Sequence, residues 1–350
     1  MALDMERVLT VSARRYEPDV WGMPGYDDRH VRNTLIDSGL VKNVESFYFS
    51  EYKDPNTSLI KYCEVVKPQA IMLSINNWPP DSTGPPSVDT FSELNKKLAI
   101  PIVMFWFDIH VTQFINMLRK YSDITDLHII FGADQSSHIP LSQDINYVYA
   151  GLAFENCYFS LLDVSKDIDV GFLGTLWKER IGYITGLVSR GFNVYTAGGV
   201  LTDEKIIVPE SKDVSRWITY KEYLELISRM KVSLNFALLE GGKYQVRARV
   251  WETLLGKTLL LEEDNPVTCR YFTPYEDYVP FSGIDDLAEK IEYYLRNSIE
   301  RDIIRVQGWK TVVDLYNPTR LWKSIFDEVD SLPSHNPGIL WNKSYFNNLG

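Results

Sequence analysis

Apolar runs of strand composition alternate with helical segments along most of this chain, and this alternation limits the folds open to it. Parallel strands need a long crossover connection, usually a helix, so such a series predicts parallel sheets with helices on both faces. In the first half, strand composition falls at residues 7–12, 44–49, 70–75, 101–107 and 127–131, and helical patterns fall at residues 28–38, 56–66, 88–98 and 111–121.

A second alternating series follows residues 150–168, which show no clear period. We expect an α/β protein of two facing, Rossmann-like, doubly wound domains at residues 1–160 and 161–318, with residues 319–350 as a terminal helix and tail. Ligands bind beyond the carboxyl ends of the strands in such sheets. The second series predicts strands at residues 169–174, 193–197, 232–236 and 258–261, and helices at residues 180–190, 220–230, 285–295, 300–315 and 319–329.

The net charge and the cysteines argue against two classes of function. A formal net charge of −11 argues against a general nucleic-acid-binding protein, which needs a basic surface to displace counterions from phosphates. Cys63, Cys157 and Cys269 lie far apart without metal-ligand spacing, so we expect reduced thiols and no metal site.

No segment of the sequence has the length and apolarity of a membrane span. The N-terminal residues lack the apolar core of a signal peptide, and the longest apolar run, residues 99–107, is too short to cross a bilayer. We expect a cytoplasmic protein without a transmembrane segment. Peripheral membrane contact and the oligomeric state stay open.

The helical pattern at residues 245–257 carries the clearest candidate site. Its apolar residues recur at helical spacing, and we expect the helix to end at Gly256 and lead into a strand. Arg249 and Glu252, three residues apart, share a helix face outside the apolar stripe. Arg247 lies roughly 200° around the helix from Arg249, so we do not expect both to reach one ligand.

Two glycine-containing turns accompany this helix. Gly241 and Gly242 precede it, and Gly174 with Thr175 ends a strand at the start of the second series. Glycine lets bare backbone amides approach a phosphate, and a helix N-terminus favours negative charge. The combination indicates a nucleotide site, with ordinary strand-ending turns as the alternative.

An ordered set of segments in the second half carries a family pattern: residues 169–175 with Arg180, 232–236, 249–256, 264–266, and 285–291 with Tyr294 and Leu295. Each segment alone is weak, but their order and spacing cover nearly half of the chain. This half resembles the C-terminal half of the group 1 glycosyltransferases with the two-domain GT-B fold. The most similar branch is that of the spore-maturation glycosyltransferases.

The resemblance implies that this half binds a nucleotide-diphosphate sugar. In that family an acid at the position of Glu252 holds the ribose hydroxyls, a task that suits a carboxylate because it accepts two hydrogen bonds. Basic side chains and bare amides would contact the phosphates, although structural salt bridges are an alternative for each base. The donor-binding candidates are Gly174, Thr175, Lys178, Arg180, Asn235, Glu240, Gly241, Gly242, Lys243, Tyr244, Arg249 and Glu252.

Tyr244 marks a departure from the wider family. Many group 1 enzymes carry two glutamates separated by seven residues, the first of which contacts the donor sugar, and counting back from Glu252 gives Tyr244. The sugar contact then falls to Glu240, to Lys243 or Tyr244, or to backbone groups around Gly242. Alternatively, this branch recognises its sugar differently.

The first half matches the family loosely, mainly through residues 100–108. Asp108 ends this predicted strand and His110 follows it, which makes them candidates for the catalytic base of an inverting enzyme; in a retaining enzyme the donor phosphate itself takes the proton. Trp21 and Trp78 lie in long loops and are candidates for stacking on the acceptor. A helix cap for His110 and hydrophobic plugs for the tryptophans are the alternatives.

We therefore expect a metal-independent, retaining glycosyltransferase that moves a sugar from a nucleotide-diphosphate sugar to a glycan or other hydroxyl acceptor, without a cofactor. In GT-B proteins the last helices often cross back, so residues 319–350 are expected to pack on the first domain. A catalytically silent nucleotide- or sugar-binding protein and a nucleotide-sugar epimerase are the alternatives. A dehydrogenase is disfavoured because no Gly-x-Gly-x-x-Gly follows the first strand.

Overall fold

The computed structural model describes residues 5–14, 16–17, 20–25, 27–75, 83–138, 140–159, 164–176, 178–198, 219–239, 242–332 and 337–348. Contacts divide the chain into two compact units. Unit 1 comprises residues 1–17, 21–156 and 315–350, and unit 2 comprises residues 18–20 and 157–314. The boundaries between the two units lie at residues 156/157 and 314/315, four residues before the expected boundaries at 160/161 and 318/319.

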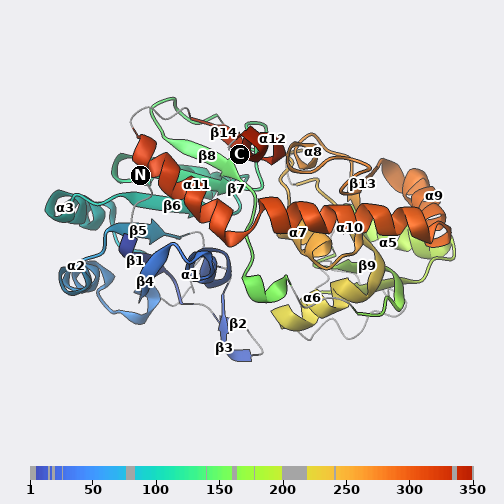
Figure 1. The fold of residues 1–350 in the computed structure, drawn as a ribbon, viewed down its shortest axis with the longest axis horizontal. Coiled ribbons are helices and arrows are strands. Elements are labelled where there is room, and N and C mark those ends of the chain that lie inside the picture. The colour runs from blue at the N-terminus through green and yellow to red at the C-terminus, as the bar shows by residue number, and fades with distance from the viewer. Residues whose placement is uncertain are drawn as a thin grey trace. The chain divides into compact units, whose positions relative to one another are not determined.

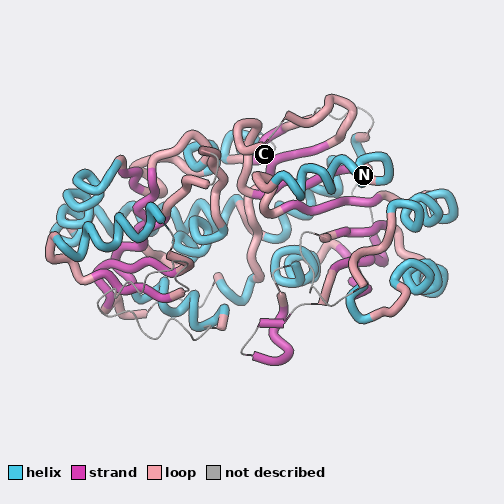
Figure 2. Tube along the Cα trace, turned by 180° about the vertical axis from the view of Figure 1, so that it is seen from behind, coloured by secondary structure: helices cyan, strands magenta, loops and turns pink. Residues whose placement is uncertain are grey.

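Unit 1 is built on a seven-stranded sheet in the order β14-β8-β7-β6-β5-β1-β4, in which all neighbouring strands are parallel (Figures 1 and 2). The parallel sheet predicted from the alternating pattern is confirmed. β8 and β14 were not predicted, and β14 has only three residues, which is too few to establish a period. The strands are β1 (Met5–Ser12), β4 (Val41–Tyr48), β5 (Ala70–Leu73), β6 (Ile102–Trp106), β7 (Leu127–Phe131), β8 (Tyr147–Ala150) and β14 (Ile339–Trp341), and a separate two-stranded sheet joins β2 (Tyr16–Glu17) and β3 (Val20–Pro24).

Side chains cap the N-termini of α2 and α3 in unit 1. Asp54 accepts a hydrogen bond from the backbone N–H of Thr57 at the start of α2, and Ser87 does the same for Thr90 at the start of α3. Such caps satisfy amides that have no partner within the helix. The helices are η1 (Asp28–Asn33), α1 (Thr34–Ser38), η2 (Phe49–Glu51), α2 (Pro55–Val66), α3 (Val88–Leu98), α4 (Thr112–Tyr121), η3 (Ser122–Ile124), α11 (Pro318–Ser331) and α12 (Lys343–Asn348), and η4 (Asn156–Tyr158) spans the boundary between the units.

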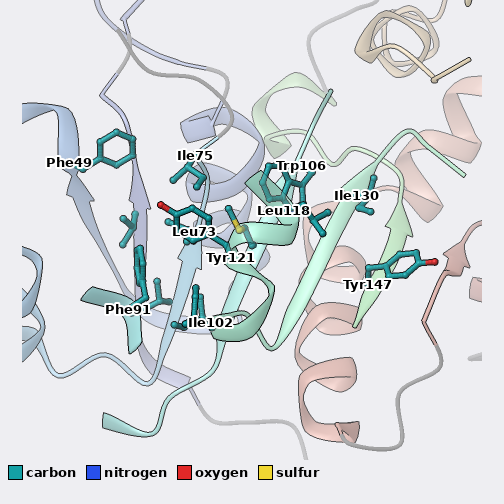
Figure 3. Packing of buried hydrophobic residues seen from close by; sticks show 14 of the residues in the cluster. Phe49, Leu73, Ile75, Phe91, Ile102, Trp106, Leu118, Tyr121, Ile130 and Tyr147 are labelled. Atoms are coloured by element: carbon teal, nitrogen blue, oxygen red, sulfur yellow. The ribbon is translucent and has the colours of Figure 1, made fainter. Parts of the chain in front are cut away.

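The central strands β5, β6 and β7 of unit 1 are buried on both faces, which explains their nearly continuous apolar composition. In Figure 3, Leu73 and Trp106 of the sheet lie in one cluster with Leu118 and Tyr121 of α4, all of them nearly inaccessible to solvent. Burying such side chains contributes about 1.5–3 kcal/mol each to stability.

The C-terminal helix α11 packs inside unit 1. Its N-cap is Asn317, and it contacts α1. The Trp322 indole is fully buried, donates a 3.0 Å hydrogen bond from Nε1 to Thr34 Oγ1, and lies 5.6 Å from the Phe105 ring. The last helices therefore return to the unit that contains the N-terminus.

Unit 2 has a five-stranded parallel sheet in the order β10-β9-β11-β12-β13. Its strands are β9 (Ile168–Leu173), β10 (Val194–Ala197), β11 (Met230–Asn235), β12 (Leu259–Glu263) and β13 (Val279–Phe281). Its helices are α5 (Lys178–Ser189), α6 (Tyr220–Arg229), α7 (Ala248–Leu255), α8 (Thr268–Tyr271), α9 (Gly283–Arg296) and α10 (Ser298–Leu315). The chain is therefore an α/β protein with two parallel sheets, as the sequence predicts.

Among the described residues, none of the helices has the length and apolarity needed to cross a membrane.

Candidate functional site

Three neighbouring strands of unit 2 end at the same edge of the sheet. β9, β11 and β12 run parallel, so Gly174, Asn235 and Glu262 all lie at or just beyond carboxyl ends. Asn235 and Glu262 are direct register partners across β11 and β12. This edge is where doubly wound sheets bind ligands.

Gly174 lies at a close approach of backbone and side chain. Its φ is +143°, a conformation that side-chain-bearing residues rarely adopt, and its N–H donates to Ala197 O at 2.8 Å. A Cβ at this position would lie 3.0 Å from Arg249 Cζ and would also clash with its Nη2. Glycine is therefore required here, because the Arg249 guanidinium lies against the backbone.

Arg249 is held from two sides. Its Nη1 donates a 2.6 Å hydrogen bond to Asn235 Oδ1, and its Cζ lies 4.5 Å from the centre of the Phe172 ring. Its Nε is buried and has no hydrogen-bond partner among the described residues. A fixed guanidinium with an unused buried donor is suited to an anionic ligand.

Arg180 lies in the same cluster and is 8% exposed. It donates from Nη1 to Thr175 O at 3.0 Å, and its Cζ lies 5.7 Å from the Phe172 ring. Burial, and then the positive charges of Arg249 and Arg247, lower the pKa of the Arg180 guanidinium to about 9, against the raising effect of Glu263. Burial and the neighbouring positive charges both disfavour the charged guanidinium, and a bound anion would offset both effects.

The position of Arg247 differs from our expectation. α7 begins at Ala248, and Arg247 is its N-cap, with an extended conformation (φ −74°, ψ 151°). The helical angle that separated Arg247 from Arg249 therefore does not apply, because it holds only within a helix. The charge of Arg247 reaches Arg180. The helical-angle argument for setting Arg247 aside therefore does not hold, and its positive charge adds to the cation cluster.

Glu252 lies beside this cluster on α7 and is 5% exposed. The Tyr223 hydroxyl of α6 donates to Glu252 Oε2 at 2.8 Å. Burial first, then the Glu252 carboxylate, raise the pKa of Tyr223 well above its usual value, and the positive charge of Arg249 opposes this rise. Arg249 and Glu252 therefore share one face, as their spacing predicts.

Asn235 and Glu262 are the most deeply buried polar residues of the site. Both are fully buried, and Asn235 Nδ2 donates to Glu262 Oε2 at 2.7 Å. Because both ends of the Asn235 amide are occupied, its direct role is to hold Arg249. Glu262 was not predicted, since the apolar run of the strand ends at Leu261 and the acidic residues after it resemble a loop.

In the turn before α7, backbone N–H groups donate hydrogen bonds to carbonyl groups of the same turn. Gly242 has a φ of +71° and donates from its N–H to Leu239 O at 3.2 Å, while Leu239 N–H donates to Lys243 O at 2.9 Å. Tyr244 forms an antiparallel bridge with Leu238. The N–H of Gly242 therefore closes the turn, which corrects the expectation that it points at a phosphate. Glu240, Gly241 and the Lys178 side chain lie outside the described residues.

In unit 1, Asp108 and His110 lie in the turn between β6 and α4, and both are partly exposed. The Asp108 carbonyl accepts a hydrogen bond from Val111 N–H at 3.1 Å. Trp78 lies outside the described residues; Trp21 belongs to β3, but its side chain is not among those described.

A carboxylate pair near η1 was missed by the sequence reasoning. Asp27 accepts a hydrogen bond from Ser74 Oγ, and Asp28 Oδ1 accepts one from Tyr48 at 3.0 Å. Burial raises the pKa of Asp28, whereas its hydrogen bond with Tyr48 lowers it. In the sequence, this pair could have been recognised as two adjacent acidic residues that follow a loop rich in glycine and aromatic residues.

Residues 166–327 match a protein family described as "Glycosyl transferase-like". This part of the chain is therefore similar to a glycosyltransferase domain. The prediction of an enzyme of that class is confirmed, whereas the spore-maturation branch stays a prediction. No curated protein matches the sequence significantly.

Solved glycosyltransferases share the fold over nearly the whole chain. A structure of Anabaena HepE in complex with UDP has a TM-score of 0.59 at 10% identity, covering 93% of this chain and 100% of that one. An alpha-glucosyltransferase in complex with UDP and a 13-mer DNA gives 0.60 at 9%, covering 93% and 100%. Sucrose-phosphate synthase from Thermosynechococcus elongatus gives 0.58 at 10%, covering 93% and 98%. The predicted GT-B fold is confirmed.

Proposed function

We propose that this protein transfers a sugar from a nucleoside diphosphate sugar to a hydroxyl acceptor, without a metal ion and with retention of configuration. The observation that carries the proposal is the cluster of Arg180, Arg247 and Arg249, of which Arg249 lies against the bare backbone of Gly174 and has Glu252 beside it. UDP sugars are the first donors to test, because HepE and the alpha-glucosyltransferase were both solved with UDP.

The cluster suits the departure of a nucleoside diphosphate. Negative charge develops on the diphosphate as the sugar bond breaks, and fixed guanidinium donors stabilise it without reorganising. In this scheme Arg249 and Arg180 supply the positive charge that a divalent ion supplies in other transferases. Retention fits a reaction in which the donor phosphate takes the acceptor proton.

Glu252 is assigned to the ribose. A carboxylate accepts hydrogen bonds from two vicinal hydroxyls, and Tyr223 fixes one of its oxygens. Lys243, Tyr244 and Glu240 remain the candidates for the sugar. Asp108, His110, Trp21 and Trp78 remain our candidates for a glycan or other hydroxyl acceptor.

The first experiment is a thermal-shift screen of uridine, guanosine, adenosine and cytidine diphosphates in EDTA. We expect one of them to raise the melting temperature without a divalent ion, and Arg249→Ala and Glu252→Ala each to remove most of that rise. Arg190→Ala is the matched control, because Arg190 is partly exposed and pairs with Asp285 on the surface of unit 2. No shift with any of the four nucleotides counts against the proposal.

Turnover separates this function from its alternatives. Transfer to an acceptor in a glycan panel, followed by NMR, identifies a transferase, and the anomeric coupling constant of the product reports retention. Nucleotide binding without hydrolysis or transfer favours a silent binding protein. Conversion of one donor into another without an acceptor identifies an epimerase.

A further inference from the structure

A chain of buried hydrogen bonds runs from the cation cluster into the sheet. Arg249 Nη1 donates to Asn235 Oδ1 at 2.6 Å, and Asn235 Nδ2 donates to Glu262 Oε2 at 2.7 Å. Glu262 Oε1 in turn accepts from Thr268 Oγ1 at 3.0 Å and Asn265 Nδ2 at 3.3 Å. These hydrogen bonds thus link the Arg249 guanidinium to the loop that follows β12.

The chemistry of the partners fixes the orientation of Asn235. A guanidinium only donates and a carboxylate only accepts, so the amide oxygen must face Arg249 and the amide nitrogen must face Glu262. A rotated amide would place its NH₂ group against Arg249 and its oxygen against Glu262. Glu262 therefore selects the one amide orientation that holds Arg249.

Glu262 is an unusual residue for the interior of a sheet. It is fully buried, and burial raises the pKa of its carboxyl to about 7, against the lowering effect of the hydrogen bonds from Asn235 and Thr268. Charged side chains are almost never fully buried unless they are paired. An apolar side chain would fill this position more favourably, so packing alone does not account for a glutamate here.

We propose that Glu262 is a positioning residue for the donor diphosphate, which acts through Asn235 to hold the Arg249 guanidinium in its binding orientation. This inference rests on the proposed function, because it takes Arg249 as a diphosphate ligand. Glu262 itself touches no substrate in this scheme.

The test is a double-mutant cycle read out by calorimetric titration with UDP and with inorganic pyrophosphate. Glu262→Leu removes the acceptor for Asn235, and we expect the dissociation constants of both ligands to rise about 10-fold, as for the loss of one charged hydrogen bond. Glu262→Gln keeps an acceptor oxygen towards Asn235, and we expect it to restore most of the affinity. In an Arg249→Ala background, Glu262→Leu should have almost no further effect.

A purely structural role is distinguished by a matched control. Asp277 is also fully buried in unit 2, accepts hydrogen bonds from Thr311 and from the Thr273 N–H, and has no contact with Arg249 among the described residues. Asp277→Asn should lower the melting temperature and leave the affinity for UDP unchanged. Should Glu262→Leu fail to fold, Asn235→Ala breaks the same link and should weaken UDP binding to a similar extent.

The measured outcomes distinguish a failure of the positioning role of Glu262 from a failure of the proposed function. Wild-type affinity in Glu262→Leu or Asn235→Ala, or an equal loss with and without Arg249, overturns the positioning role and leaves the proposed function standing. A wild-type protein that binds neither pyrophosphate nor any nucleoside diphosphate overturns both.

Discussion

Replacing Gly174 by alanine tests the link between backbone geometry and ligand binding. The added Cβ would lie 3.0 Å from Arg249 Cζ and clash with its Nη2, and the φ of +143° is strained for any residue with a Cβ. The guanidinium is the movable partner, but moving it breaks its hydrogen bond to Asn235. The substitution therefore acts on the backbone and on Arg249 together.

Both contributions can be estimated. A residue other than glycine in a sparsely populated backbone region costs about 1–3 kcal/mol. The loss of a hydrogen bond to a charged group costs about 1.5–3 kcal/mol. We expect the free energy of unfolding to fall by about 2.5–6 kcal/mol, and the dissociation constant of UDP to rise about 10- to 100-fold because Arg249 is displaced.

Urea unfolding measures the first quantity and calorimetric titration the second. Gly182→Ala on α5 is the control, because a Cβ there meets nothing within 4 Å and alanine is favoured in a helix, which should add up to about 1 kcal/mol. The reasoning is refuted if Gly174→Ala retains wild-type stability and wild-type affinity for UDP.

Three further predictions concern stability. Gly198→Ala should lower the free energy of unfolding more than Gly174→Ala does in urea unfolding, because its Cβ would lie 2.6 Å from the Gly174 carbonyl carbon, which is backbone and cannot rotate away. Burial lowers the pKa of His30 and of His128 to about 3 from 6.5, so the unfolded chain takes up protons first as the pH falls, and stability is lost below about pH 6.5. Urea unfolding should show a loss of about 2 kcal/mol per histidine between pH 7 and pH 5, and a His128→Gln variant with an unchanged pH profile would contradict this. Trp322→Ala should lower the free energy of unfolding by about 3–5 kcal/mol by calorimetry, whereas Trp322→Phe, which keeps a ring in the core, should lose far less.

Local sequence patterns predicted most of the long elements. The helical pattern at residues 245–257 ends at Gly256 as expected and leads into β12, and Arg249 and Glu252 lie on one face. The start of the same helix was placed too early. The apolar period extends back to Val246, but Arg247 is extended, so periodicity alone did not locate the first turn.

The sequence by itself determined the alternation of strands and helices, and hence two parallel sheets, because the periods of strand and helix are local properties. Only the tertiary structure decided that Arg180 meets Arg247 and Arg249, that Asn235 faces Glu262 across two strands, and that β14 adds a strand beside β8. These contacts join segments far apart in the chain. They depend on strand order and register, which no local period encodes.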